Sequence, residues 1–368
     1  MWRDWRNRLL MSPRFQRLAG SLPFIRGRAR REARELFDIV AGFTYSQITL
    51  ACVRLRLLEH VRAGAVSEQV LVESMSMSPA AALTLLRAAA ALELLEPCQA
   101  VGKASWMLGR RGAALLGNPG VLAMIEHHAV LYADLVDPVA MLRAPRGDTA
   151  LARYWPYAVA AVPGEVAAQG TEAYTSLMSA SQGLVAEEIL DAYDFRRHRR
   201  VLDVGGGDGT FLRALARRLD DVGLMLFDLP GVVNTARQKF IAAGLETRVS
   251  MHPGDFSRDA LPAGADLITF VRVLHDHDDP RVEQMLRAAF AALPSGGRLL
   301  VAEPLAGTPG AERMGDAYFG LYLWAMGSGR PRTAETLEQM LRLAGFTHIV
   351  RRGTRIPLQT SVLVAERP

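Results

Sequence analysis

Apolar residues recur at helical spacing through the first third of the chain. Over residues 32–62 they lie three or four positions apart, which predicts one long helix or two shorter ones. Further short helices are expected at 68–74 and from Pro79, because proline is favoured at the first position of a helix. Two short β-like segments follow, at Leu95–Cys98 and Ser105–Leu108, with a glycine-containing turn between them. This order of elements is the outline of a winged helix.

The pattern changes near the middle of the chain. Residues 120–195 have a helical composition, and prolines at 138, 145, 156 and 163 are expected to break the region into pieces. From 196–200 onward, short apolar strands alternate with amphipathic helices. This alternation predicts a doubly wound α/β domain in the second half of the chain.

A winged helix raises the question of DNA binding. The expected recognition helix, which starts at Pro79, is nearly all alanine and leucine and carries one arginine, Arg87. A helix that reads base edges in the major groove needs several polar or basic side chains. We therefore predict that this domain closes a pocket and forms a homodimer, and that it does not bind nucleic acid.

Composition and charge indicate the cellular compartment and reveal one unusual segment. Half of the 368 residues are hydrophobic, and Cys52 and Cys98, the only cysteines, form no metal-binding or disulfide pattern. No run of 18 apolar residues is present, which argues against a transmembrane helix, and the expected location is the cytoplasm. Residues 1–34 contain ten arginines interleaved with tryptophan and phenylalanine. This arm is expected to pack on protein, and the competing hypothesis is peripheral contact with the inner or photosynthetic membrane.

Candidate chemistry begins at a glycine-rich loop. The apolar strand Val201–Val204 is followed by Gly205-Gly-Gly-Asp-Gly209 and then by an amphipathic helix. Strand, glycine loop and helix form the unit of a nucleotide-type fold, in which glycines let the backbone approach a ligand closely. The G-x-G-x-G spacing fits a dinucleotide pyrophosphate less well, and no lysine of the phosphate-binding type follows.

Two carboxylates follow the next two strands. Asp228 ends the second strand, where a carboxylate can accept from both ribose hydroxyls of a nucleoside. Gly254-Asp255-Phe256 follows the third strand, where Asp255 can accept from an adenine amino group and Phe256 can cover the ring. These features together indicate an adenosine-type ligand without phosphates, and S-adenosylmethionine fits that description.

Five motifs occur in order: Leu202–Gly209, Phe227–Pro230, Gly254–Phe256, Arg272–Asp276 and Val301–Glu303. In this order and spacing the chain resembles the plant caffeate and animal acetylserotonin O-methyltransferases over its whole length. The resemblance implies a Rossmann-like seven-stranded methyltransferase sheet preceded by a winged-helix-like dimerisation domain. The predicted chain then has four segments. They are a basic arm at 1–30, a dimerisation domain at 31–120, a helical connecting and pocket segment at 121–195, and a cofactor-binding catalytic domain at 196–368.

The resemblance also implies the roles of individual residues. His275 would be the general base that takes the proton of the acceptor hydroxyl, and Glu303 would orient its imidazole. The implied cofactor-binding residues are Asp203, Gly205, Gly207, Asp228, Leu229, Gly254, Asp255, Phe256 and Arg272. Two departures weaken the match, because His277 stands where the family has tryptophan and Pro331 where it has a second catalytic carboxylate. No metal is expected, since the family acts without one.

The acceptor is predicted from an apolar stripe and from a narrower resemblance. The expected pocket residues are Tyr174, Met178, Tyr318, Tyr322 and Met326. The last three recur every four positions, a spacing that more often marks a helix's packed face and that here would describe a large apolar acceptor. The runs Trp5–Leu10, Leu36–Gln47 and Gly329–Thr333 look like those of bacterial 1-hydroxycarotenoid O-methyltransferases. That likeness implies the tertiary hydroxyl of an acyclic carotenoid of the hydroxyneurosporene or demethylspheroidene type.

Other functions stay open at this point. The acceptor could instead be a bacteriochlorophyll precursor, methylated at oxygen or carbon, or a phenolic or polyketide compound. Two alternatives of another class are a winged-helix regulator that senses S-adenosylmethionine and a relative that binds the cofactor without transferring methyl. The missing carboxylate at Pro331 keeps the last of these open.

Overall fold

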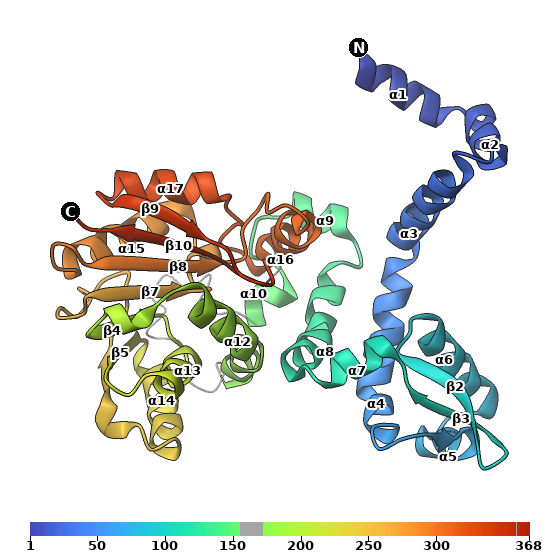
Figure 1. The fold of residues 1–368 in the computed structure, drawn as a ribbon, viewed down its shortest axis with the longest axis horizontal. Coiled ribbons are helices and arrows are strands. Elements are labelled where there is room, and N and C mark those ends of the chain that lie inside the picture. The colour runs from blue at the N-terminus through green and yellow to red at the C-terminus, as the bar shows by residue number, and fades with distance from the viewer. Residues whose placement is uncertain (155–171, 358) are drawn as a thin grey trace. The chain divides into compact units, whose positions relative to one another are not determined.

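The chain forms two compact units, Met1–Gly117 and Asn118–Pro368 (Figure 1). The structure is a computed structural model that describes residues 1–154, 172–357 and 359–368, with the backbone alone for 172–181. The first unit has one hydrophobic cluster of its own, and the second has three.

The first unit is mainly helical. Its elements are α1 (Trp2–Met11), α2 (Pro13–Ser21), α3 (Arg26–Arg54), α4 (Leu57–His60), β1 (Val66–Ser67), α5 (Glu68–Ser74), α6 (Pro79–Ala91), β2 (Leu95–Ala100), β3 (Lys103–Leu108) and α7 (Arg110–Leu116). The strands form a small antiparallel sheet in the order β1-β3-β2. Buried Leu57, Leu71, Leu86 and Trp106 belong to the core between sheet and helices.

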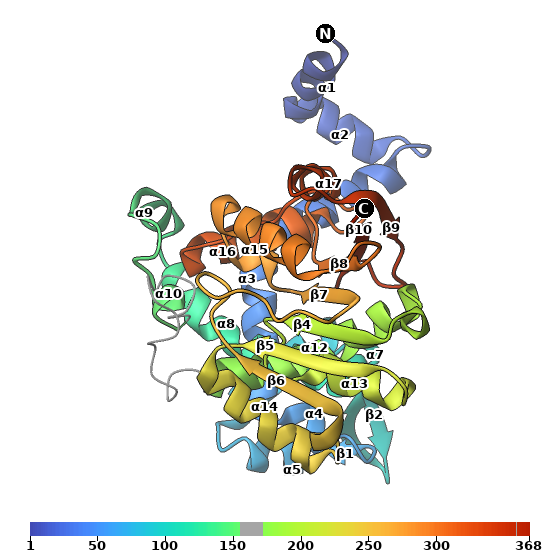
Figure 2. The same cartoon turned by 90° about the vertical axis from the view of Figure 1, so that its left-hand side faces the viewer.

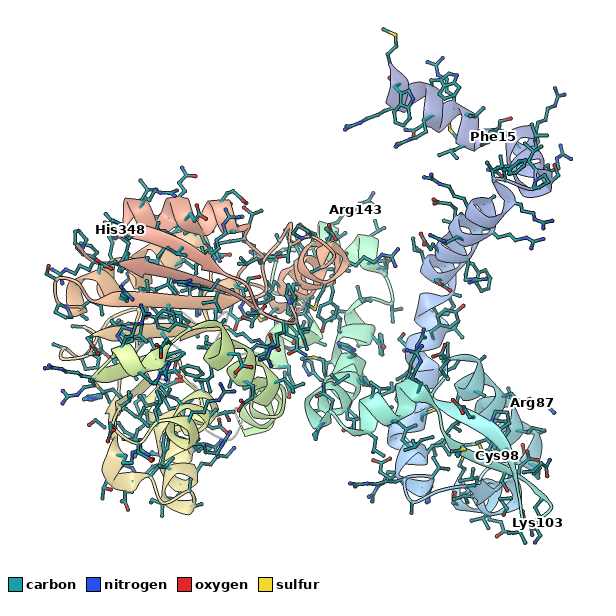
Figure 3. The ribbon with its side chains drawn as sticks, viewed as in Figure 1. Phe15, Arg87, Cys98, Lys103, Arg143 and His348 are labelled. Carbon is teal, nitrogen blue, oxygen red and sulfur yellow. The ribbon has the colours of Figure 1, made fainter. Side chains whose placement is uncertain are left out.

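The segment 32–62, expected to form one helix or two, lies in two, α3 and the short α4. Helix α3 starts earlier than expected, at Arg26, inside the arginine-rich segment that apolar periodicity does not register, and it ends before Arg56, whose backbone is left-handed at φ 50°. The winged-helix outline is otherwise as expected, and α6 starts at Pro79 with Ser78 as its N-cap. Arg87 is exposed on α6 and is its one basic side chain (Figure 3).

Large apolar side chains remain exposed on the first unit. Those of α3 are Leu36, Phe37, Ile39, Val40 and Phe43, and those of α1 include Trp2 and Trp5. Among the described residues α3 is also the one helix long and apolar enough to cross a membrane. Length and composition are the two properties that this helix shares with a spanning segment. The sequence predicted no membrane-spanning helix, and α3 corrects that prediction because it meets both criteria.

The second unit begins with helices. They are α8 (Pro119–Asp134), α9 (Pro138–Arg143), α10 (Ala150–Tyr154) and α12 (Glu172–Ala192). Pro138 starts α9 after the N-cap Asp137, so it begins a helix where the sequence suggested only a break. Pro156 and Pro163 lie outside the described residues.

The remainder of the second unit alternates strands and helices. Its elements are η3 (Phe195–Arg197), β4 (Arg200–Val204), α13 (Thr210–Arg218), β5 (Gly223–Asp228), α14 (Pro230–Ala242), η4 (Glu246–Arg248), β6 (Val249–Pro253), β7 (Leu267–Val271), η5 (Leu274–Asp276), α15 (Asp279–Ala292), β8 (Arg298–Glu303), η6 (Arg313–Tyr318), α16 (Phe319–Met326), α17 (Ala334–Leu343), β9 (Thr347–Arg352) and β10 (Ser361–Glu366). The strands form the predicted seven-stranded sheet in the order β6-β5-β4-β7-β8-β10-β9.

Helices cover both faces of this sheet (Figure 2). One core contains residues of α12, α13 and α14, the other those of α15 and α17, and alternate strand residues contribute to each. All strands are parallel except β10, which runs antiparallel to β8 and β9. The strand order reverses between β4 and β7, so the loops after these two strands meet at the point where open α/β sheets bind their ligands.

Candidate active site

The loop after β4 is built for close approach of a ligand. Gly205, Gly207 and Gly209 all have positive φ, at 68°, 59° and 78°, which residues with a side chain rarely adopt. A Cβ on Gly206 would lie 2.5 Å from Oδ2 of Asp203. Asp203 is buried beneath this loop, where its Oδ1 accepts from Thr269 Oγ1 at 2.6 Å. Burial raises the pKa of Asp203 to about 7, and nearby Asp228 adds to the effect.

Asp228 ends β5 and faces the same loop. Its Oδ2 accepts from the Gly207 amide at 2.8 Å and its Oδ1 from the Leu229 amide at 2.7 Å. Burial raises the pKa of this carboxyl to about 6, and the two amide bonds partly offset the effect. The carboxyl is therefore held in a fixed orientation with lone pairs to spare, since each oxygen has two.

Asp255 offers an unsatisfied acceptor. Its Oδ1 accepts from the amide and hydroxyl of Ser257 at 2.8 and 2.6 Å. Its Oδ2 is buried and has no hydrogen-bond partner in the described part of the chain, as is also true of Asp203 Oδ2 and Gln182 Oε1. The Gly254 amide donates to the carbonyl of Asp228, which links the two loops at 2.9 Å. Because unpaired buried acceptors are costly, they indicate a ligand that donates hydrogen bonds here.

His275 lies in η5, directly after β7, between two carboxylates. Its Nδ1 contacts Glu303 Oε2, and its Nε2 lies 3.2 Å from Asp276 Oδ1. The other oxygen of Glu303 accepts from the amides of Val273 and Leu274 at 2.9 and 2.7 Å. Glu303 is 1% exposed and His275 7%. The carboxylate on Nδ1 fixes the ring and leaves Nε2 as the basic nitrogen.

The pKa of His275 is raised although the ring is buried. Burial acts to lower it, but the charges of Asp276 and Glu303 together outweigh burial. The pKa of Asp276 is also raised, because burial dominates and the neighbouring His275 offsets only part of it. A proton that arrives at Nε2 is thus stabilised by carboxylates on both sides of the imidazole.

The loop that carries His275 is fastened from the segment before α17. The buried Arg332 donates to the carbonyls of Leu274 and His277 at 2.8 and 2.6 Å. A Cβ on Gly329, whose φ is 77°, would lie 2.0 Å from the His275 carbonyl oxygen. These contacts explain why glycine stands at position 329 and arginine at position 332, but they supply no carboxylate near Pro331.

The remaining predicted cofactor residues gather at the same edge of the sheet. Phe256 lies edge-on to His277 with ring centres 5.1 Å apart. Burial lowers the pKa of His277 to about 3, and Arg281 adds to the effect, so this histidine is a neutral packing residue. Arg272 has positive φ (56°), and its amide donates to the Ala302 carbonyl at 2.9 Å. Its charge acts on both His275 and Asp276.

The predicted pocket stripe is packed more tightly than an open wall. Tyr322 and Met326 are 5% and 0% exposed and belong to the cluster that joins α8, α9, α10 and α16, whereas Tyr318 is half-buried. Phe319 lies edge-on to His275 with ring centres 5.9 Å apart, which connects this segment to the base. The side chains of Tyr174 and Met178 lie outside the described residues, and only their backbone, in α12, is defined.

Sequence reasoning missed several residues of this region. Asp276 is not among the predicted site residues, yet its carboxylate lies beside the base nitrogen of His275. His127 and His128 on α8 form hydrogen bonds of 2.7 Å with the hydroxyls of Tyr322 and Tyr318. Adjacent histidines are a visible signal, but no spacing connects them with tyrosines about 190 positions away.

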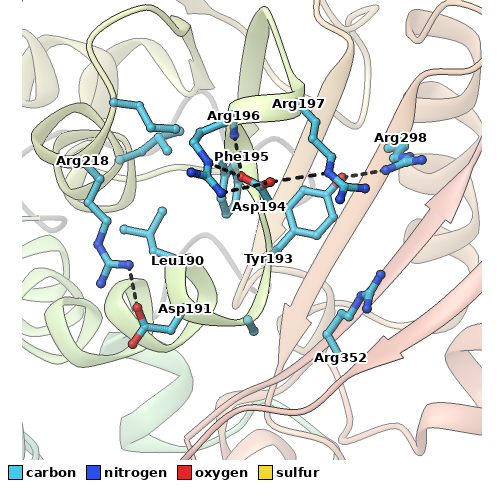
Figure 4. A pocket seen from close by; sticks show the side chains of 13 residues that line it. Leu190, Asp191, Tyr193, Asp194, Phe195, Arg196, Arg197, Arg218, Arg298 and Arg352 are labelled. Atoms are coloured by element: carbon cyan, nitrogen blue, oxygen red, sulfur yellow. Dashed lines mark hydrogen bonds and ion pairs between the residues drawn. The ribbon is translucent and has the colours of Figure 1, made fainter.

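A pocket lies beside the ends of α12 and α13 and the segment that leads into β4 (Figure 4). It has a volume of about 530 Å³ and is lined by Arg196, Arg197, Arg218, Arg298 and Arg352 together with Asp191, Asp194 and apolar residues. Arg218 pairs with Asp191 at 2.6 Å and Arg196 with Asp194 at 2.8 Å. Both aspartates keep lowered pKa values, mainly through these arginine hydrogen bonds. This pocket is remote from the glycine loop and His275, which follow the other ends of the strands.

Comparison with known proteins identifies the class. Residues 132–347 match the family model of the O-methyltransferase domain. The chain is 44% identical to demethylspheroidene O-methyltransferase of Cereibacter sphaeroides over 98% of this chain and 94% of that protein. It is 42% identical to the protein of the same name from Rhodobacter capsulatus, over 98% and 88%. The structure of human N-acetylserotonin methyltransferase in complex with SAM has the same fold, with a TM-score of 0.75, 22% identity and coverage of 91% and 97%.

The chain therefore belongs to the O-methyltransferase family, and it is an S-adenosylmethionine-dependent enzyme. The residues at the carboxyl edge of the sheet fit this cofactor. They provide unpaired buried acceptors, a glycine loop and a fixed carboxylate, and no phosphate-binding group is needed. Within the described residues, no group of three or more histidine, cysteine or acidic side chains could hold a metal ion.

Proposed function

We propose that this enzyme methylates the tertiary 1-hydroxyl of an acyclic carotenoid, with His275 as the general base. The observation that carries the acceptor is the similarity, over nearly the whole chain, to two proteins named demethylspheroidene O-methyltransferase. The apolar surroundings of Tyr318 and Tyr322 agree with a polyene that has few polar groups.

Three side chains and two glycines would hold the cofactor. Asp228 would accept from the ribose hydroxyls, and Asp255 Oδ2, which has no partner in the described chain, would accept from the adenine amino group. Phe256 would cover the ring, and Gly205 and Gly207 would let the backbone approach the ligand. When bound, S-adenosylmethionine supplies a methyl group activated by the positive charge of its sulfonium.

His275 would take the proton of the acceptor hydroxyl at Nε2. Glu303 keeps the opposite nitrogen protonated and the ring fixed, and Asp276 lies beside Nε2, where it would stabilise the imidazolium that forms. A tertiary alcohol is far less acidic than a phenol, so His275 cannot ionise it beforehand. Proton transfer to Nε2 would therefore accompany methyl transfer, and a raised His275 pKa assists because the ring then holds the proton more firmly.

The test is transfer of radiolabelled methyl to a detergent-dispersed panel. The panel contains a 1-hydroxy acyclic carotenoid, a bacteriochlorophyllide and a simple phenol. Label in the carotenoid alone is expected. Label only in the phenol or the macrocycle would refute the acceptor while retaining the enzyme class. A carotenoid that lacks the 1-hydroxyl is the matched control and should receive no label.

We further propose that α3 pairs with a second copy of this chain. Its exposed apolar residues Phe37, Val40 and Phe43 lie on a helix that also carries charges of both signs, which suits a protein partner. Replacing Phe37 and Phe43 by glutamate should convert a dimer to a monomer in sedimentation velocity. A wild-type chain that sediments as a monomer at micromolar concentration would contradict the proposal.

The arm formed by α1 and α2 would touch an anionic membrane surface. It exposes Trp2, Trp5 and Leu10 among five arginines, with Asp4 as its one acidic residue. Removal of residues 1–25 should abolish flotation with anionic liposomes while neutral liposomes bind neither form. Equal flotation of the full chain and the truncated chain would exclude this role.

A further inference from the structure

Two consecutive histidines of α8 each form a hydrogen bond with a tyrosine near the active site. His127 Nε2 lies 2.7 Å from the Tyr322 hydroxyl, and His128 Nε2 lies 2.7 Å from the Tyr318 hydroxyl. Tyr318 and Tyr322 are four residues apart, and their rings stack with centres 5.7 Å apart and planes 30° apart. We call these contacts the two histidine–tyrosine pairs.

The two pairs are buried in surroundings that disfavour charge on their histidines, and one of them lies close to the base. Burial lowers the pKa of His127 to about 4, with His128 adding to the effect, and burial lowers the pKa of His128 as well. The pKa of Tyr318 is raised by its burial. Phe319 lies edge-on to Tyr318 and also to His275, with ring centres 5.1 and 5.9 Å apart. Tyr318 thus lies one aromatic ring away from the histidine that would take the proton.

A tyrosine hydroxyl next to an apolar ligand is normally a disadvantage. In the free enzyme water can satisfy it, but an apolar chain that displaces this water gives no hydrogen bond in return. A partner on the protein removes the penalty, because the hydroxyl then needs nothing from water or ligand. The ring itself still offers a large flat apolar surface to a polyene.

We propose that His128 occupies the hydroxyl of Tyr318, so that this half-buried tyrosine presents only apolar surface and the enzyme selects an apolar acceptor. Tyr322 is 5% exposed, so it belongs to the packed cluster on which the Tyr318 ring stacks and forms no open wall. This inference rests on the proposed function, because it assigns Tyr318 to the wall that receives the polyene. His128 is a positioning residue that acts through Tyr318. A direct role for the Tyr318 hydroxyl in proton transfer would predict the opposite behaviour on substitution.

The test uses binding, so that it does not depend on methyl transfer. A 1-hydroxy acyclic carotenoid is titrated into the full-length enzyme with S-adenosylhomocysteine present, and quenching of tryptophan fluorescence reports the Kd. His128→Phe leaves the Tyr318 hydroxyl with only its long contact to Met124 Sδ, at 3.7 Å, and should weaken binding about tenfold. Adding Tyr318→Phe to this variant removes the poorly paired hydroxyl and should restore the affinity to within about threefold of wild type. His128→Gln, which keeps a hydrogen-bonding group, should bind better than His128→Phe.

A matched pair elsewhere in the same unit provides the control. Tyr193 and His198 form the same 2.7 Å contact, buried at the opposite edge of the sheet. His198→Phe should lower Tm without changing the Kd of the carotenoid. If His128→Phe does not fold, Tyr318→Phe alone keeps the inference falsifiable, because this variant should bind the carotenoid at least as tightly as wild type.

Each outcome decides the inference. A double variant as weak as His128→Phe, or weaker, would overturn it, because the tyrosine hydroxyl would then contribute favourably. Equal affinity of all variants would also overturn it. Wild-type enzyme that binds the carotenoid tightly but does not methylate it refutes the proposed function alone, and the restored affinity of the double variant would still support the pairs. Wild-type enzyme that fails to bind it refutes both.

Discussion

Charged groups lie at both edges of the seven-stranded sheet, but the two edges differ in how these groups are hydrogen-bonded. At the carboxyl edge, Asp228 and Asp203 are buried with raised pKa values, and acceptor atoms lack partners in the described chain. At the amino edge, Asp191 and Asp194 are bound by arginines and have lowered pKa values. Burial without full pairing, and not the number of charges, distinguishes a ligand site from a solvated surface.

The largest expected effect comes from the base itself. His275→Ala should reduce kcat by about 10²- to 10⁴-fold, because the acceptor proton loses its destination. Binding of S-adenosylmethionine, measured by calorimetry, should remain because Asp228 and Asp255 are untouched. His198→Ala at the amino edge is the control, with kcat expected near wild type. A normal kcat for His275→Ala would show that His275 is not the general base.

The next effect concerns the fixed carboxylate. Asp228→Asn should weaken S-adenosylmethionine binding about 100-fold, or about 3 kcal/mol, because an amide group cannot accept from Gly207 and Leu229 on both sides. Asp194→Asn, the corresponding change at the amino edge, should leave the Kd within about twofold. Binding by wild type should also weaken as the pH falls below about 6, where Asp228 becomes protonated. A Kd that does not change between pH 5 and 8 would contradict this assignment.

The sequence was sufficient for the sheet and for the residues that follow its strands. Apolar runs, glycines and the position of Asp228 relative to β5 are local features, and local features survive folding unchanged. It could not supply Asp276 at the base nitrogen of His275, because that contact depends on the turn of η5. The pairing of His127 and His128 with Tyr322 and Tyr318 was also invisible, since it requires α8 to pack on α16. The start of α3 at Arg26 was missed because arginine carries no apolar signal.

A smaller effect concerns the pKa of His275, which the carboxylates at the carboxyl edge raise. Turnover requires His275 neutral, and its pKa lies above the usual 6.5 because two carboxylates outweigh burial. The rate should therefore rise with pH through a pKa above 6.5. Glu303→Gln removes one of those charges, so the rise should move to lower pH even as the maximal rate falls. Glu187→Gln, at the amino edge, should leave the pH profile unchanged. A Glu303→Gln profile displaced to higher pH would contradict the conclusion that Glu303 raises the pKa of His275.

The smallest expected effect tests whether the charged residues at the amino edge have any role in catalysis. Arg218 pairs with Asp191 and Glu187, and about a third of its side chain, 36%, is exposed. Exposed ion pairs contribute little, since solvent screens the charges and ordering the side chains costs entropy, so Arg218→Gln should lower Tm by about 3 °C or less. It should leave kcat and the Kd for S-adenosylmethionine unchanged, and high salt should reduce the Tm difference. A change in kcat would mean that the arginine-lined pocket communicates with the carboxyl edge, and charge pairing alone would then no longer separate the two edges.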